Sequence, residues 1–179
     1  MPDRSTTAAV AAHPESHGLV REGIVTGLVG AAAVALWFLA VDTLGGRPLH
    51  TPALLGAVLA ASPDATAAAT GPSRLTYAAL YTIAHLVAFA AVGLLATFLV
   101  HRAERTPPLV ALLVMLFAAV EVAFVGFVAL LEVQAIGDVA WYQVALGNVV
   151  AAVAMGWYLL RNHPTIGARF GEAYASGRD

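Results

Sequence analysis

Four stretches of the sequence are each long enough and apolar enough to cross a lipid bilayer as a helix. A helix needs about 20 mostly apolar residues to cross the hydrocarbon core. Water is absent from that core, so each stretch must satisfy its own backbone hydrogen bonds. The sequence therefore predicts an all-α polytopic membrane protein. We expect a four-transmembrane-helix bundle with spans at about 22–43, 75–101, 109–132 and 138–161.

The composition agrees with a membrane protein. The chain of 179 residues is 60% hydrophobic and 11% charged, with a mean hydropathy of +0.80. Too few charges are present to cover a water-soluble surface. All nine basic residues are arginine, which together with abundant alanine and glycine is typical of a GC-rich bacterial genome. No basic patch with interleaved aromatic residues occurs, so nucleic acid is not an expected partner.

The arginines predict the orientation of the spans, because basic residues in short loops stay on the cytoplasmic side. With four spans, seven arginines fall on one side: Arg4, Arg21, Arg102, Arg105, Arg161, Arg169 and Arg178. The opposite side holds only Arg47 and Arg74. We therefore expect a multi-pass protein of the bacterial inner membrane with both termini in the cytoplasm.

The chain divides into a transmembrane domain and two tails. Residues 1–18 are polar and rich in small side chains, which is typical of a disordered cytoplasmic tail. Residues 19–163 form the expected four-helix domain, and residues 164–179 form a second cytoplasmic tail.

The outer loop, residues 45–74, contains a short predicted helix. Thr51-Pro52 is a favourable start, with threonine as the N-cap and proline in the first turn, and Ser62-Pro63 ends the pattern. The helix is too short to span, so we expect it at the outer interface. It would be either a lid or docking surface, or a plain connector, and the connector is the commoner case. His50 beside it is interpreted as an ordinary loop histidine rather than a ligand.

Small residues recur every four positions on the first span and form a stripe that lets another helix backbone approach closely. The stripe consists of Gly23, Gly27, Ala31 and Ala35. Asp42 continues the same face. On the fourth span, helical spacing groups Asn148 with Ala145, Ala152 and Met155 on one contact face.

Three polar residues from three spans fall at similar depths near the membrane centre. At a rise of ~1.5 Å per residue, His85 lies ~15 Å from the outer side, Glu121 ~18 Å from the inner side and Asn148 ~14 Å from the outer side. An ionised carboxylate at this depth is costly, so Glu121 is expected to face protein rather than lipid. Tyr81 lies one turn from His85 on the same face.

A secondary polar track would extend from this cluster to the outer surface. Tyr77, Tyr81 and His85 follow one another at spacings of four on the second span. Glu121 and Glu132 share a face of the third span, eleven residues apart. With Asp42 near the outer end of the first span, these groups would line a path from outside to the midplane.

Three interpretations of the midplane cluster stay open. His85, Glu121 and Asn148 would be hydrogen-bonding contacts between helices, a proton-accepting or small-ligand site, or ligands of a metal or haem. One intramembrane histidine cannot supply both axial ligands of a haem, and His101 lies ~24 Å further along the helix. A haem would therefore need a partner subunit. No cofactor is predicted, and no metal site is assigned.

Catalytic motifs are absent from the sequence, so an enzyme is not indicated. It has no cysteine, which excludes thiolate chemistry and iron–sulfur ligation. It has no Gly-rich phosphate loop, zinc-protease motif or nucleophile elbow. His13 and His17 have metal-like spacing but flank Pro14 in the tail, and we expect them to be solvated. Glu22, at the edge of the first span, is likewise expected to be a solvated charge.

The segments 30–42 and 46–53 resemble a family of small four-span bacterial inner-membrane proteins to which no activity is assigned. The resemblance implies the four-span fold and transfers no function. Our hypothesis from the residues is a membrane protein with a midplane polar site at His85, Glu121, Asn148 and Tyr81 for proton-linked transport or small-ligand binding. The rival hypothesis is a non-catalytic structural or assembly subunit. Besides the bilayer, the expected partner would be a second copy or a larger membrane complex.

Overall fold

The computed structural model describes residues 14–103 and 141–163, and in these two ranges every regular element is a helix. The elements are α1 (Pro14–Leu44), α2 (His50–Leu59), α3 (Ala65–Thr70), α4 (Arg74–Ala103) and α6 (Trp141–Asn162). The all-helical prediction is therefore confirmed for the described part of the chain. α1 starts upstream of the predicted span because proline is tolerated in a first helical turn and no breaker follows it.

Three of these helices are long and apolar enough to cross a membrane: Gly18–Leu44, Arg74–Arg102 and Tyr142–Asn162. Their outward surfaces carry large apolar side chains, and Leu36, Val87 and Val153 are each 66% exposed. Such surfaces are compatible with contact to lipid and not with a water-soluble protein. The predicted third span, 109–132, lies outside the described residues.

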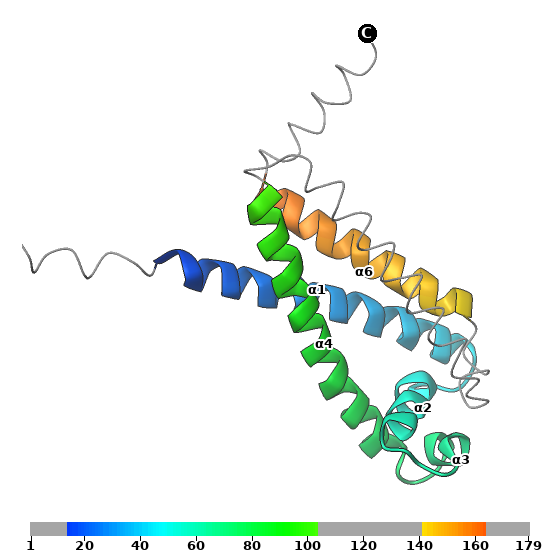
Figure 1. Cartoon of the computed structure of the whole chain (residues 1–179). Coiled ribbons are helices and arrows are strands. Elements are labelled where there is room, and N and C mark those ends of the chain that lie inside the picture. Colours follow the sequence, from blue (N-terminus) through cyan, green and yellow to red (C-terminus); the bar gives the residue numbers. More distant parts are fainter. Residues whose placement is uncertain (1–13, 104–140, 164–179) are drawn as a thin grey trace, which may run out of the picture.

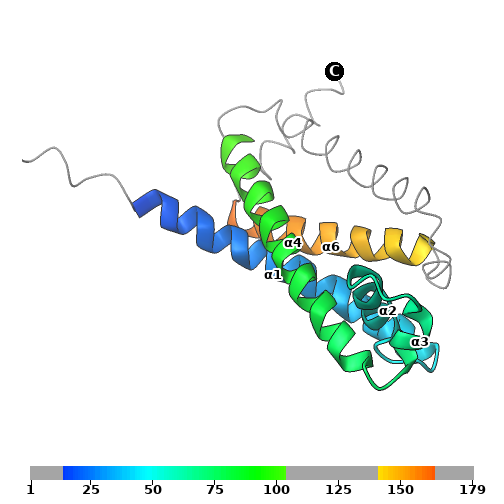
Figure 2. The same cartoon turned by 60° about the horizontal axis from the view of Figure 1, so that its bottom comes forward.

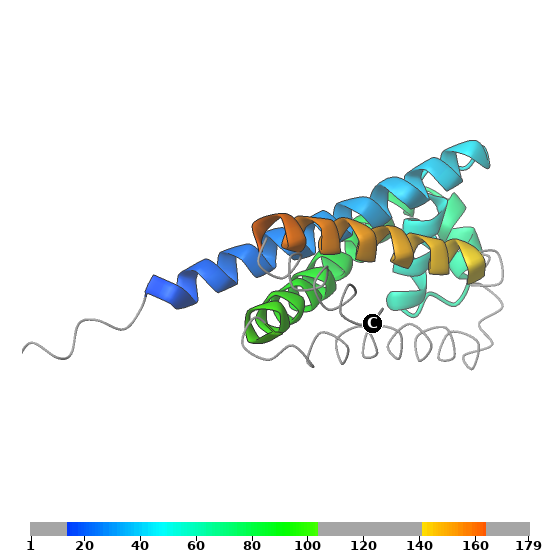
Figure 3. The ribbon, with the colours of Figure 1, turned by 90° about the horizontal axis from the view of Figure 1, so that it is seen from above.

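α4 crosses α1 near its middle, while α6 lies beside α1 (Figures 1 and 2). Seen from above, α6 runs beside α1 over much of its length (Figure 3). Both partners run antiparallel to α1. Gly23 and Gly27 meet Leu94 and then Phe89 of α4. Glu22 meets His163 after the end of α6, and Trp37 meets Gln143 near its start. α4 and α6 therefore run in the same direction.

Glycines make the α1–α4 crossing possible. A Cβ atom on Gly93 would clash with the backbone of Gly23 and Gly27, and one on Gly27 would clash with the Phe89 carbonyl. Close approach of backbones through small residues is the usual packing device of helices in lipid. Of the stripe expected on the first span, Gly23 and Gly27 lie in this contact and Ala31 is buried, whereas Ala35 is exposed.

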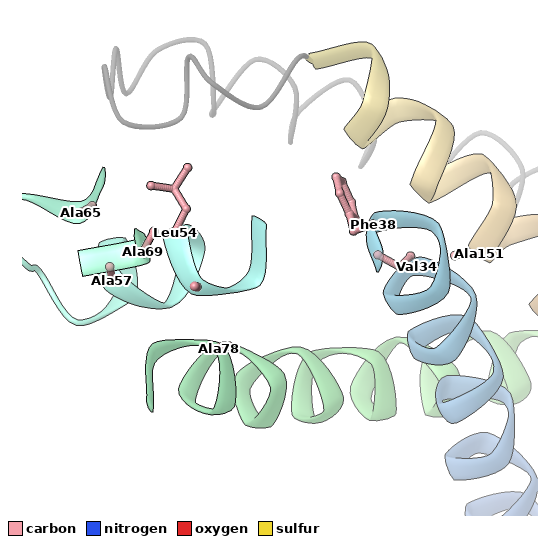
Figure 4. Packing of buried hydrophobic residues seen from close by; sticks show 9 residues of the cluster. Val34, Phe38, Leu54, Ala57, Ala65, Ala69, Ala78 and Ala151 are labelled. Carbon is pink, nitrogen blue, oxygen red and sulfur yellow. The ribbon is translucent and has the colours of Figure 1, made fainter. Parts of the chain in front are cut away.

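α2 packs across the first turns of α4 at the other end of the bundle. A Cβ atom on Gly56 would clash with the Tyr77 backbone, so the two helices touch there. Ala53, Leu54 and Ala57 are fully buried in the apolar cluster that α2 shares with α3 and α4. In this cluster the Leu54 side chain points away from α4 (Figure 4). Asp64 caps α3 by accepting a hydrogen bond from the Ala67 N–H at 2.9 Å.

The predicted N-cap of α2 is wrong. Leu49, in the left-handed conformation with φ 65°, occupies the cap position and makes no side-chain capping bond. Thr51 lies inside the first turn and its side chain turns to Asp42 instead. The carboxylate of Asp42 accepts bonds from the Thr51 N–H at 2.8 Å and from its hydroxyl at 2.7 Å. α1 thus caps α2 through a buried acidic side chain, a partner that local sequence cannot reveal.

α6 packs on α1 through a face that shares Met155 with the expected one but is rotated away from Ala145, Asn148 and Ala152. Its buried residues are Gly147, Ala151, Met155 and Leu159. Trp37 of α1 donates its indole N–H to the Gln143 carbonyl at 2.9 Å and anchors the start of α6. Asn148 is half-buried beside this face.

Candidate functional site

A cavity of about 210 Å³ lies between α1, α2 and α4. Its walls are mostly apolar and include Val34, Phe38 and Leu39 of α1. The polar groups that line it are Asp42, Thr51, Tyr81, Thr82 and His85. Two of the predicted midplane residues, His85 and Tyr81, therefore belong to one cavity wall.

His85 sits in an aromatic ladder on α4. Its ring stacks on Tyr81 with centroids 5.4 Å apart and contacts Phe89 at 4.6 Å. Its Nε2 lies 3.4 Å from the Ala31 carbonyl oxygen on α1. A carbonyl can only accept, so this contact requires the proton on Nε2 and leaves Nδ1 as an acceptor. The half-buried imidazole thus links the two crossing helices and keeps one nitrogen available for other interactions.

Asp42 lies at one end of the cavity, where it is only 7% exposed. Both of its carboxylate oxygens already accept bonds from Thr51. The residue therefore shapes the cavity by holding α2 in place rather than by offering a free carboxylate. Tyr77, expected in the same polar track, packs its backbone against Gly56 of α2.

The remaining predicted residues are not brought into this cavity by the described structure. Asn148 is on α6, which packs on another face of α1, and it is not among the described residues that line the cavity. Glu121 and Glu132 lie outside the described residues. The outer-loop residue His50 is buried, and its Nε2 has no hydrogen-bond partner among the described residues.

A second cluster, which the sequence did not indicate, lies at the opposite end of the bundle. Glu22 of α1, His101 of α4 and His163, directly after α6, place their ligand atoms within 4.8 Å of one another. Glu22 was expected to be solvated, but its side chain is only 17% exposed. His163 Nε2 lies 2.9 Å from Glu22 Oε1, and His101 Nε2 lies 3.7 Å from Oε2. We refer to these three residues as the inner-end cluster.

The inner-end cluster could not be found from sequence spacing. Two of its members lie on α1 and α4 and the third directly follows α6, and no motif relates them. The sequence gives one indication of the cluster. Each of the three residues lies within two positions of an arginine that is predicted at the cytoplasmic membrane surface. Among the described residues, these three form the group of histidine and acidic side chains whose ligand atoms lie close enough together to bind one metal ion.

Comparisons of the chain with protein-family models, with curated proteins and with solved structures gave no significant match. Any statement of function therefore rests on the geometry of these two sites.

Proposed function

We propose that this chain is a four-span inner-membrane protein that binds a small amphipathic molecule in the cavity between α1, α2 and α4. The cavity carries the proposal, because it joins apolar walls to a small set of polar groups. Binding sites for small molecules have this composition, with apolar area for affinity and a few polar atoms for orientation.

The cavity favours a ligand that arrives from the bilayer. Leu36 and Leu39 line it and are 66% and 44% exposed on the surface of α1. These side chains would face lipid in a membrane. A molecule dissolved in the bilayer would therefore reach the cavity sideways, past apolar side chains.

The ligand is expected to be small and to carry one polar group. A volume of about 210 Å³ suits roughly a single-ring molecule, since an apolar protein cavity of about 150 Å³ holds benzene. His85 Nδ1 would accept a hydrogen bond, and the Tyr81 hydroxyl would donate or accept one. The Thr82 hydroxyl already donates to the Ala78 carbonyl at 2.7 Å, so it would only accept. Proton-linked transport would also need Glu121, which lies outside the described residues.

The direction of the helices supports four spans. α4 ends beside His163, at the inner-end cluster, whereas α6 begins beside Trp37 near the other end of the bundle. Residues 104–140 thus join two points at opposite ends of the bundle. The proposed span at 109–132 would connect them by one crossing, which agrees with four spans and with both termini on the cytoplasmic side.

Filling the cavity tests the proposed binding. Ala35 lines the cavity and is exposed, so Ala35→Phe should fill it without disturbing the core. Native mass spectrometry of the wild-type chain, purified in mild detergent, should show a small bound molecule. This adduct should disappear in Ala35→Phe.

The matched control is Ala32→Phe, which adds the same ring one turn away at an exposed position that does not line the cavity. It should keep the bound molecule. An adduct of equal occupancy in wild type, Ala35→Phe and Ala32→Phe would contradict the proposal, as would a wild-type chain that carries no adduct when purified from its native membrane.

A further inference from the structure

The inner-end cluster joins the three long helices at one point. His163 Nε2 lies 2.9 Å from Glu22 Oε1, and the rings of His101 and His163 meet edge to face with centroids 4.8 Å apart. The side chains of Glu22 and His163 are 17% and 11% exposed, and that of His101 is 37% exposed. Two imidazoles and a carboxylate therefore converge in a partly sheltered position that solvent can still enter.

The tautomer of His101 is favourable for a metal ligand. Its Nδ1 lies 3.0 Å from the Thr97 carbonyl oxygen one turn earlier. Because the carbonyl accepts, Nδ1 carries a proton, and the neutral imidazole then presents the Nε2 lone pair toward Glu22. A ligating histidine that donates its other N–H to a backbone carbonyl is the usual outer-shell arrangement of protein metal sites.

The surroundings of Glu22 favour a cation. α4 ends at Ala103 and α6 at Asn162, so both present the negative ends of their dipoles near the cluster. No arginine neutralises the carboxylate in the described part of the chain, where both ion-pair partners of Glu22 are histidines. The nearby Arg161 lies over the Trp157 ring instead, 5.4 Å from its centroid.

We propose that Glu22, His101 and His163 bind a divalent transition-metal ion such as zinc. The ligand set of two histidines and one carboxylate is one that zinc accepts, and water would complete a tetrahedral shell. Ligand atoms in such a shell lie about 3.4 Å apart, at bond lengths of about 2.1 Å. The separations of 2.9 and 3.7 Å from the two histidines to different Glu22 oxygens bracket this value, and the ligand atoms of all three residues lie within 4.8 Å of one another. On binding, the metal replaces the proton between His163 and Glu22, and that proton leaves to solvent.

Zinc titration of the full-length chain tests this site. We expect isothermal calorimetry of the tag-free protein in detergent to show one Zn²⁺ per chain. Glu22→Gln and His163→Gln should each weaken binding by more than about 100-fold, beyond the 10–100-fold typical of losing an outer-shell partner. His163→Cys should retain binding, because a thiolate is also a zinc ligand and the chain has no other cysteine.

The double variant His13→Gln/His17→Gln, which changes His17 in the first turn of α1 and His13 just before it, is the control for zinc held at the N-terminal tail, and it should bind as the wild type does. Gel filtration should show that every variant is monodisperse. Zinc binding by His163→Cys would show that His163→Gln loses binding because a ligand is missing and not because the protein is unfolded. The proposal is overturned if the wild type binds no zinc, if Glu22→Gln and His163→Gln bind as tightly as wild type, or if the tail variant removes binding. The site is at the opposite end of the bundle from the cavity, so either proposal can fail alone.

Discussion

At the scale of single residues, the most consequential contact is the one between Asp42 and Thr51. The carboxylate is buried and accepts two hydrogen bonds from one residue in the first turn of α2. It satisfies an N–H group that the start of a helix otherwise leaves unpaired, and its charge suits the positive end of the helix dipole. One side chain of α1 thereby fixes both the position of α2 and one end of the cavity.

Asp42→Ala should lower the free energy of unfolding by about 1–3 kcal/mol, because it leaves two donors of Thr51 unsatisfied in a buried place. The measurement is thermal or denaturant unfolding of the purified chain in detergent. Thr51→Ser keeps both donors and should stay within about 0.5 kcal/mol of wild type. Equal stability of Asp42→Ala and wild type would show that the contact contributes nothing.

At the scale of elements, the α1–α4 crossing depends on the absence of side chains at its centre. Gly23 and Gly27 on α1 meet Gly93 on α4, so the two backbones touch directly. The stripe on the first span could be recognised from its period of four. Its partner, Gly93, could not, because a lone glycine in an apolar helix carries no information about which helix it faces.

Gly93→Ala should destabilise the bundle by about 1–3 kcal/mol, since the added methyl group would force two backbones apart. Gly156→Ala is the matched control. A Cβ atom there meets no described residue within 4 Å, so alanine should be neutral or stabilising by up to about 1 kcal/mol through its higher helix propensity. Unfolding of both variants in the same detergent checks the contrast, and equal effects of the two substitutions would refute the packing argument.

At the scale of the whole molecule, the two sites lie at opposite ends of the bundle. The cavity lies toward α2 and the start of α4, while the inner-end cluster lies where α4 and α6 end. With the proposed orientation, the cavity belongs to the outer half of the membrane and the cluster to its cytoplasmic surface. Ligand and metal would therefore reach the protein from different compartments.

Cysteine labelling in intact cells tests this orientation. The natural chain has no cysteine, so Ser73→Cys before α4 and Ser176→Cys near the C-terminus provide single reporters. A membrane-impermeant maleimide should label Ser73→Cys in intact cells and Ser176→Cys only after the membrane is permeabilised. Labelling of both positions in intact cells would place the C-terminus outside the cell. That result would contradict four spans with cytoplasmic termini.

The sequence by itself determined that the three long described elements are helices able to cross a membrane and that a short helix lies between the first two, whereas α3 was not predicted. The reason is local: an uninterrupted apolar stretch of about 20 residues must satisfy its backbone internally whatever surrounds it. It also placed His85 and Tyr81 on one helix face, since a spacing of four depends only on the helical period.

Only the tertiary structure decided which polar groups meet. Glu22, His101 and His163 come together because α4 crosses α1 at the glycine contact and α6 packs beside it. The same arrangement directs Asp42 to Thr51 and leaves Asn148 away from the cavity. Depth along a helix can be counted from sequence, but the rotation of each helix about its axis is set by close packing against its neighbours. That rotation determines the partners of every polar side chain.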